Sequence, residues 1–249
     1  MATKNKTIPA PESVPAHLTA DSLKFLRALG RHNDREWFQP RKAEFESLLR
    51  QPMLSVIRKV TEAMAGFAPD HMRPAEKCIF RIYRDTRFSN DKSPYKTHVA
   101  AWWARQGMEK TSGAGYYLHV TAKDVLLAAG IYMPDKDQLR QIRLWLLDHH
   151  AEFRKILHRP ALQRAFTEMD TNPLTRPPKG FPADHAAMDL ICCRQWGVSV
   201  TLGSEVALDP KFAQTLTRYF RLAAPLVDAL NAPLVASLGP KRKVLFGLR

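Results

Sequence analysis

Cationic and aromatic side chains alternate through the segment from Arg81 to His98, RIYRDTRFSNDKSPYKTH. The cations of this segment are Arg81, Arg84, Arg87, Lys92 and Lys96. Only two carboxylates, Asp85 and Asp91, oppose their charge. Guanidinium groups match the oxygen atoms of phosphate and carboxylate, and aromatic rings can stack on a base. The segment therefore predicts an anionic partner.

The geometry expected for this segment is a strand followed by a loop. Arg81 then lies on the opposite face of the strand from Arg84. It is therefore outside the cluster of cations that the loop can bring together. The predicted anion-binding residues are Arg84, Arg87, Lys92, Tyr95 and Lys96. A structural alternative stays open, in which Asp85 and Asp91 pair internally with Arg87 and Lys92 and order a long hairpin loop.

Two histidines, His98 and His119, are the candidates for acid–base catalysis, because the ordinary pKa of histidine lies close to neutral pH. His119 alternates with Tyr117 along one predicted strand, and His98 lies on the strand before it. If the strands align, both rings face one groove together with Arg81 and Tyr83. The alternative is that each histidine is a hydrogen-bonded structural residue.

The loop RHNDREWFQP contributes predicted supporting residues for this pocket. Asn33 suits a turn or a helix cap, and Trp37 with the phenylalanine after it suits a contact with the core. Arg35 or Glu36 would then be held over the basic segment, as a structural salt bridge or as a ligand contact. The supporting residues expected around the pocket are Asn33, Arg35, Trp37, Arg81, Asp85, Tyr117 and Asp184.

Three pairs of adjacent residues carry metal-ligand chemistry: Asp184-His185, His149-His150 and Cys192-Cys193. None has the spacing of a zinc site, so no metal is predicted, and no motif identifies a cofactor. The few cysteines do not form a disulfide framework and suit reduced thiols in the cytoplasm.

The periodicity of the apolar residues predicts an α+β fold. Alternating strands are expected at 78–85, 97–106, 114–121, 124–133 and 196–202, and the first four form an antiparallel meander. Helical spacing is expected on both sides of these strands, with a break at Pro52 and a short helix at 161–169. Helices, then strands, then helices favour a single domain with an antiparallel sheet of about four to six strands.

The 249-residue chain carries a formal net charge of +14, which suits anionic metabolites or nucleic acid. Residues 1–17 are polar and proline-rich and are expected to be a disordered lead-in. The domain is expected at 18–232, followed by a basic tail at 233–249. No stretch of sequence is apolar enough for a membrane span, so no membrane partner is predicted.

Five sequence elements together resemble one family. They are NDREWF at 33–38, FRIYRDTRFSNDKSPYKTH at 80–98, GYYLH at 115–119, Met133-Pro134 and RPPKGFPADH at 176–185. In this order, from about residue 20 to residue 231, they resemble the domain of unknown function 2461 family. The resemblance implies a soluble, mostly bacterial, single-domain protein and implies no reaction. Among the motif positions that the resemblance implies, Gly180 is added to the residues named above, and many of these positions are polar or charged.

The leading functional hypothesis is binding of a phosphorylated or other anionic small molecule, such as a nucleotide, through the 84–98 loop. One alternative is a non-catalytic nucleic-acid-binding protein that uses its basic surface and its tail. Another is a protein-interaction module in which the basic loop is structural. The sequence leaves open whether the protein is an enzyme, and which oligomeric state it adopts.

Overall fold

The computed structural model describes residues 14–87, 89–108 and 113–237. They form one antiparallel sheet, in the order β1-β2-β3-β5-β4, with helices packed against it, which confirms the predicted α+β class. The strands are β1 (Val99–Trp103), β2 (Gly115–Val120), β3 (Asp124–Ile131), β4 (Glu168–Asp170) and β5 (Trp196–Gly203). The long helices are α1 (Ala20–Arg31), α4 (Gln51–Met64), α6 (Lys136–Leu157) and α9 (Phe212–Ser237). The short helices and helical turns are α2 (Arg35–Phe38), η2 (Gln39–Arg41), α3 (Lys42–Phe45), η3 (Glu46–Arg50), η4 (Pro69–His71), α5 (Ala75–Cys78), α7 (Pro160–Ala165), α8 (Met188–Ile191) and η5 (Ser204–Leu208).

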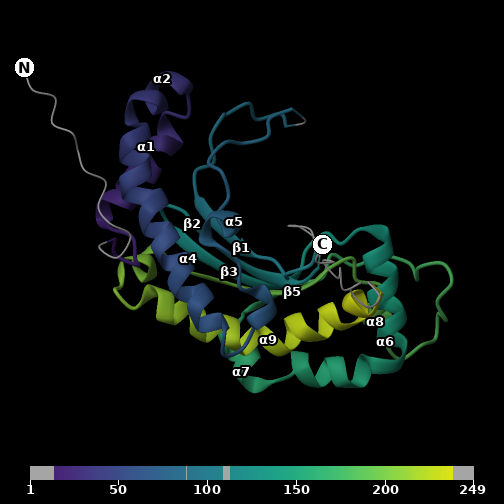
Figure 1. Ribbon diagram of the computed structural model, residues 1–249. Helices are drawn as coiled ribbons and strands as arrows, with labels where there is room; N and C mark the ends of the chain where they lie inside the picture. Colours follow the sequence, from purple (N-terminus) through teal and green to yellow (C-terminus); the bar gives the residue numbers. More distant parts are fainter. Residues whose placement is uncertain (1–13, 88, 109–112, 238–249) are drawn as a thin grey trace, which may run out of the picture.

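The sheet has one covered face and one open face, because side chains alternate along each strand. On β2, Tyr116 and Leu118 are fully buried, whereas Tyr117 and His119 are half-buried. The covered face packs on α9, where the Phe220 ring lies 5.2 Å from the Tyr116 ring. Figure 1 shows α6, α7 and α9 below the sheet. The opposite face, called the open face from here on, carries Tyr117 and His119.

The helical break expected at Pro52 appears as the π-helical turn η3 directly before α4. Proline has no N–H, so it cannot donate to the carbonyl of Leu48 four residues earlier. The Ser22 hydroxyl of α1 donates to this carbonyl instead, at 2.6 Å. A buried serine thus satisfies the acceptor that the proline leaves open and joins α1 to the start of α4.

Two element predictions were wrong. Residues 78–85 form no regular strand, because the chain leaves the short helix α5 at Cys78 and then makes only isolated bridges at Ile79 and Tyr83. Residues 161–169 are not one helix, because α7 ends at Ala165 and the chain then pairs with β5 as β4. The predicted meander holds for β1, β2 and β3.

The expected domain limits coincide only partly with the described chain. Ala16, inside the predicted lead-in, is buried, and the Val14 carbonyl accepts a hydrogen bond from Ser55 at 2.8 Å. Helix α9 continues beyond residue 232 to Ser237. The rest of the predicted lead-in and tail, 1–13 and 238–249, lies outside the described residues. Within the described ranges, no helix is both long and apolar enough to cross a membrane.

Candidate functional site

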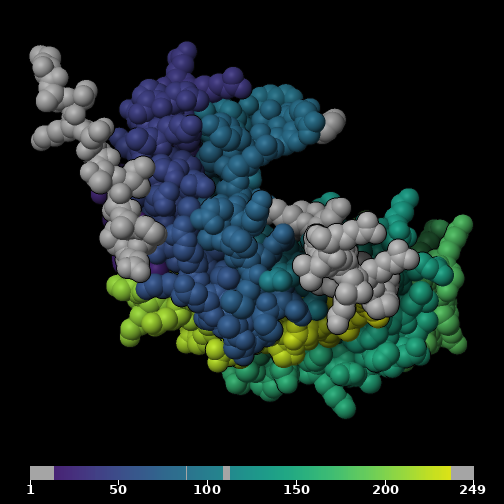
Figure 2. Space-filling view, in the orientation of Figure 1, coloured from purple at the N-terminus to yellow at the C-terminus, as the bar shows by residue number. Residues whose placement is uncertain are grey.

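The basic segment forms most of an irregular hairpin, described at residues 79–87 and 89–98, that leads into the edge strand β1 and bridges to it at Ile79 and Ala101. The Phe80 N–H donates to the Ala100 carbonyl at 2.9 Å, and the Lys96 N–H donates to the Ile82 carbonyl at 2.8 Å. Pro94 has no N–H to donate, so the backbone hydrogen bonds between the two arms of the hairpin are interrupted there. Figure 1 shows the hairpin rising away from the sheet, and in the space-filling view its outer end overhangs the body (Figure 2).

Ion pairs inside the hairpin engage two of the four cations predicted to bind an anion, and a hydrogen bond engages a third. Arg84 pairs with Asp91, and the Arg87 Nη2 lies 2.7 Å from Asp85 Oδ2. The Lys92 ammonium donates to a backbone carbonyl at 3.0 Å. The internally paired arrangement therefore holds for Asp85 with Arg87, whereas Asp91 pairs with Arg84 and not with Lys92.

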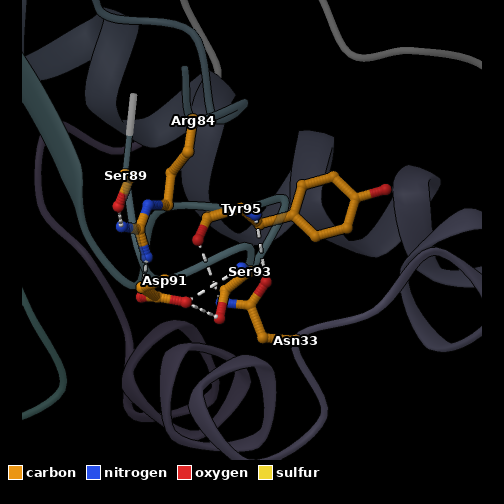
Figure 3. Close-up of polar contacts among 6 residues, drawn as sticks. All are labelled: Asn33, Arg84, Ser89, Asp91, Ser93 and Tyr95. Atoms are coloured by element: carbon orange, nitrogen blue, oxygen red, sulfur yellow. Dashed lines mark hydrogen bonds and ion pairs between the residues drawn. The ribbon is translucent and has the colours of Figure 1, made fainter. Parts of the chain in front are cut away.

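Hydrogen bonds to these two carboxylates keep both of them ionised. The Arg87 side chain, followed by its backbone N–H, lowers the pKa of Asp85 to about 2. The Ser93 hydroxyl and N–H, followed by Arg84, lower the pKa of Asp91 far below its usual range. Figure 3 shows Arg84 directed at Asp91 and Ser89, with Ser93 on the other side of the carboxylate.

Tyr95, predicted to contact the ligand, is instead a core residue. Its side chain is 1% exposed, and its ring stacks on Phe38 with the centroids 4.1 Å apart. Asn33 holds the backbone of Tyr95 by two hydrogen bonds, donating to the carbonyl at 2.9 Å and accepting from the N–H at 3.0 Å (Figure 3). Both residues therefore fix the hairpin to the helical part of the fold.

The other predicted supporting residues do not gather at one point. Trp37 packs on Phe25, with the ring centroids 5.5 Å apart, and Arg35 is exposed in the first turn of α2. Arg81 is exposed on the hairpin. Asp184 lies in the loop before α8, where the adjacent His185 packs against His150 of α6.

The structure brings the two candidate histidines together on the open face, as the strand alternation predicts. The rings of His98 and His119 stack with centroids 5.0 Å apart. The Tyr117 hydroxyl lies 3.2 Å from His119 Nδ1. Phe80, rather than Arg81 or Tyr83, contacts Tyr117, and the Lys96 ammonium lies 5.0 Å above the Phe80 ring.

A hollow of about 490 Å³ opens beside this cluster, and we call it the open-face hollow. Its walls include Phe80, Trp102, Tyr117, His119, Tyr132 and Asp170. Small residues that are neighbours across the sheet form the floor of the hollow. Gly115 pairs with Gly130, and Gly130 pairs with Gly197. Ala128 lies two residues before Gly130 on the same face of β3. Apolar walls with a few polar groups are typical of small-molecule sites.

Burial shifts the titration of the groups beside the hollow. Desolvation, followed by the charges of His119 and Lys96, lowers the pKa of His98 to about 4. Desolvation also lowers the pKa of His119, and it raises the pKa of Tyr117. Both imidazoles are therefore neutral at pH 7, and each can accept a hydrogen bond or a proton. Within the described part of the chain, no group of three or more His, Cys, Asp or Glu side chains is placed to hold a metal ion.

A family model described as "Conserved hypothetical protein (DUF2461)" matches residues 21–228. The chain belongs to the DUF2461 family. No curated protein and no solved structure matches it.

The sequence patterns above did not predict the glycine floor of the open-face hollow. At Gly130, φ is +132°, and a Cβ atom would collide with the carbonyl oxygen of Trp196. At Gly115, a Cβ atom would lie 2.7 Å from the Trp102 ring, so the absence of a side chain lets this ring lie across the floor. Glycine inside an alternating strand marks a close approach of backbone or ligand, and that signal was present.

We expect acid to destabilise this DUF2461 protein partly through His98. Its pKa is about 4 in the folded chain and about 6.5 when unfolded, so the unfolded chain binds more protons between these values. The contribution of His98 to the free energy of unfolding is complete above pH 6.5 and falls as the pH is lowered toward 4. The loss should be about 1–2 kcal/mol, since the ring is partly exposed to screening solvent. Urea midpoints across this pH range measure it.

The matched variants are His98→Gln and His158→Gln, the latter at an exposed position after α6. His98→Gln should flatten the pH dependence, and His158→Gln should preserve it. A His98 titration midpoint near 6.5 by NMR would contradict the prediction.

Proposed function

We propose that this protein binds an anionic small molecule with a planar ring system, such as a nucleotide, in the open-face hollow. The observation that supports this most directly is the glycine floor walled by Phe80, Trp102 and Tyr117 beside the Lys96 ammonium. Aromatic rings stack on a heterocycle, and an ammonium group matches phosphate charge.

The hairpin has a different role in this proposal from the one expected in the sequence. Because Arg84 and Arg87 already pair with carboxylates, they order the hairpin, and only its surplus charge attracts the anion. The neutral His98 and His119 provide acceptors for N–H or O–H groups of the ligand. A cytoplasmic location is part of the proposal, since free thiols and nucleotides occur together there.

Thermal shift of the purified chain against nucleotides, sugar phosphates and carboxylates, at fixed ionic strength, tests the proposal. A ligand at about 100 times its dissociation constant should stabilise the protein by about 2.7 kcal/mol. Ala128→Leu should abolish the shift, because the longer side chain fills the floor between Tyr117 and Ser199. Thr201→Leu, on the same face but outside the hollow lining, should preserve it.

Charge recognition is tested separately with Lys96→Ala and the exposed Lys123→Ala. Loss of the ammonium group beside Phe80 should weaken binding of a nucleoside phosphate about tenfold and leave binding of the uncharged nucleoside nearly unchanged. Lys123→Ala should behave as the wild type. Isothermal titration of both ligands makes the comparison. Equal losses for the two ligands would contradict a role of Lys96 in recognising charge.

The same variants separate the alternative functions. Binding to nucleic acid through the whole basic surface should weaken steeply with salt and should be indifferent to Ala128→Leu. A flat ligand screen together with salt-sensitive binding of oligonucleotides would replace the small-molecule proposal.

A further inference from the structure

Another cavity, smaller than the open-face hollow, opens between the base of the hairpin and the helical turns α3 and η3. Its volume is about 210 Å³, and we call it the hairpin cavity. At about 30 Å³ for each water molecule, it has room for about seven of them. Pockets for larger ligands enclose about 300–1,000 Å³. The hairpin cavity therefore suits a molecule with one small ring.

The buried part of the lining of the hairpin cavity is apolar. Phe38, Phe45, Ile82 and Val99 all line the cavity and are all buried. His98 lines it as well, and its imidazole is neutral at pH 7 because desolvation, followed by nearby charges, lowers its pKa to about 4. Such a lining favours the aromatic or aliphatic body of a ligand.

The charged part of the lining carries more cations than anions. Its cations are Lys42, Arg50 and Arg81, and its one carboxylate among the described residues is that of Glu46. Glu46 accepts hydrogen bonds from Arg50 at 2.8 Å and from Gln51 at 2.6 Å. Because Arg50 and Glu46 neutralise each other, the excess positive charge of the cavity comes from Lys42 and Arg81.

Lys42 and Arg81 form no ion pair with another described residue. The charge of Arg81 also acts on Asp85, but that carboxylate is hydrogen-bonded to Arg87. Both cations are exposed, so an anion would meet them at the solvent-facing side of the cavity. Two like charges that line one cavity repel each other, and an anion between them offsets this repulsion.

We propose that the hairpin cavity binds a small aromatic carboxylate, with its ring against the apolar lining and its carboxylate between Lys42 and Arg81. A guanidinium fork matches the two oxygen atoms of a carboxylate, and aromatic side chains pack well against a single ring. In the part of the chain that the structure describes, this cavity shares only Phe80 with the lining of the open-face hollow. The proposal therefore does not rest on the function proposed for that hollow.

The test compares phenylacetate with two control compounds on the full-length chain. Phenylacetamide keeps the ring and the shape but has no charge, and acetate keeps the charge but has no ring. We expect phenylacetate to raise the melting temperature at pH 7 and equal ionic strength, and neither control to do so. No shift with phenylacetate, or an equal shift with either control, would overturn the proposal.

Variants assign the binding to this cavity. Arg81→Ala and Lys42→Ala change exposed side chains, so both should fold, and each should weaken phenylacetate binding about tenfold in isothermal titration. Arg176→Ala, at an exposed position in the loop before α8, is the matched control and should bind as the wild type. Ala128→Leu, which fills the open-face hollow, should also leave this binding unchanged. Binding that survives both cation variants, or that is lost in folded Ala128→Leu, would overturn the assignment.

Discussion

Replacing Tyr95 with alanine should lower the free energy of unfolding by about 3–5 kcal/mol, as is typical when a large buried aromatic ring is removed. The side chain is 1% exposed, stacks on Phe38 and packs 5.5 Å from the ring of Tyr83. Its removal leaves a cavity where the hairpin meets the helices. Chemical denaturation followed by circular dichroism measures the loss.

Tyr95→Phe is the control for this prediction. It keeps the ring and removes only the hydroxyl, which lies near the Gln39 side chain, so it should cost about 0.5–1.5 kcal/mol. A residue whose task is to stack on a ligand would behave differently. Tyr95→Ala would then retain full stability and lose only ligand binding, and that outcome would contradict the buried role.

The local alternation of the strands predicts the face on which each histidine lies, and the contact between the histidines was predicted on the condition that the strands align. Side chains two residues apart share a face of a strand, so the sequence alone places Tyr117 with His119. The register of β1 against β2 pairs Ala100 with His119, and this pairing brings His98 against the same ring. The sheet class and the face of each histidine therefore follow from short-range pattern, whereas the contact between the two rings depends on the register of β1 against β2.

The predictions that were wrong concern residues whose partners are distant in the sequence. Residues Glu168–Asp170 are all exposed and show no apolar alternation, and they form a strand only because β5 lies beside them. The contact of Asn33 with Tyr95 spans 62 residues, and no pattern near either residue indicates it. The local sequence around a tyrosine among cations is the same whether its ring stacks on a base or on Phe38.

These distant contacts change the role that we assign to the segment from Arg81 to His98. Its carboxylates hold the hairpin together and its tyrosine holds it to the body, and the ligand site of the proposed function is the neighbouring open-face hollow. In this proposed site, Lys96 and His98 of the segment lie beside the ligand, whereas Arg84, Arg87 and Tyr95 hold the hairpin in place. The residues that line the open-face hollow are small or aromatic, and several of them look unremarkable in the sequence.

Replacing Asn33 with alanine should lower the free energy of unfolding by about 2–3 kcal/mol. The amide makes two hydrogen bonds to the backbone of Tyr95, as a neighbouring strand would. Alanine removes both and leaves an N–H and a carbonyl of a buried residue without partners, which costs more than the bonds themselves contribute. Denaturant midpoints measure the loss, and hydrogen exchange of the Tyr95 amide reports it locally.

Two variants separate this backbone role from a general effect of the loop. Asn33→Asp keeps an acceptor for the Tyr95 N–H but faces the carbonyl with a carboxylate, so it should be nearly as damaging as alanine. Asp34→Ala removes only the cap of α2, where the carboxylate accepts the Trp37 N–H at 2.7 Å, and should cost about 1 kcal/mol. If Asn33→Ala cost no more than Asp34→Ala, the hairpin would not depend on the amide. Its orientation over the sheet would then have to come from the stack of Tyr95 on Phe38 and from the backbone hydrogen bond of Phe80 to β1.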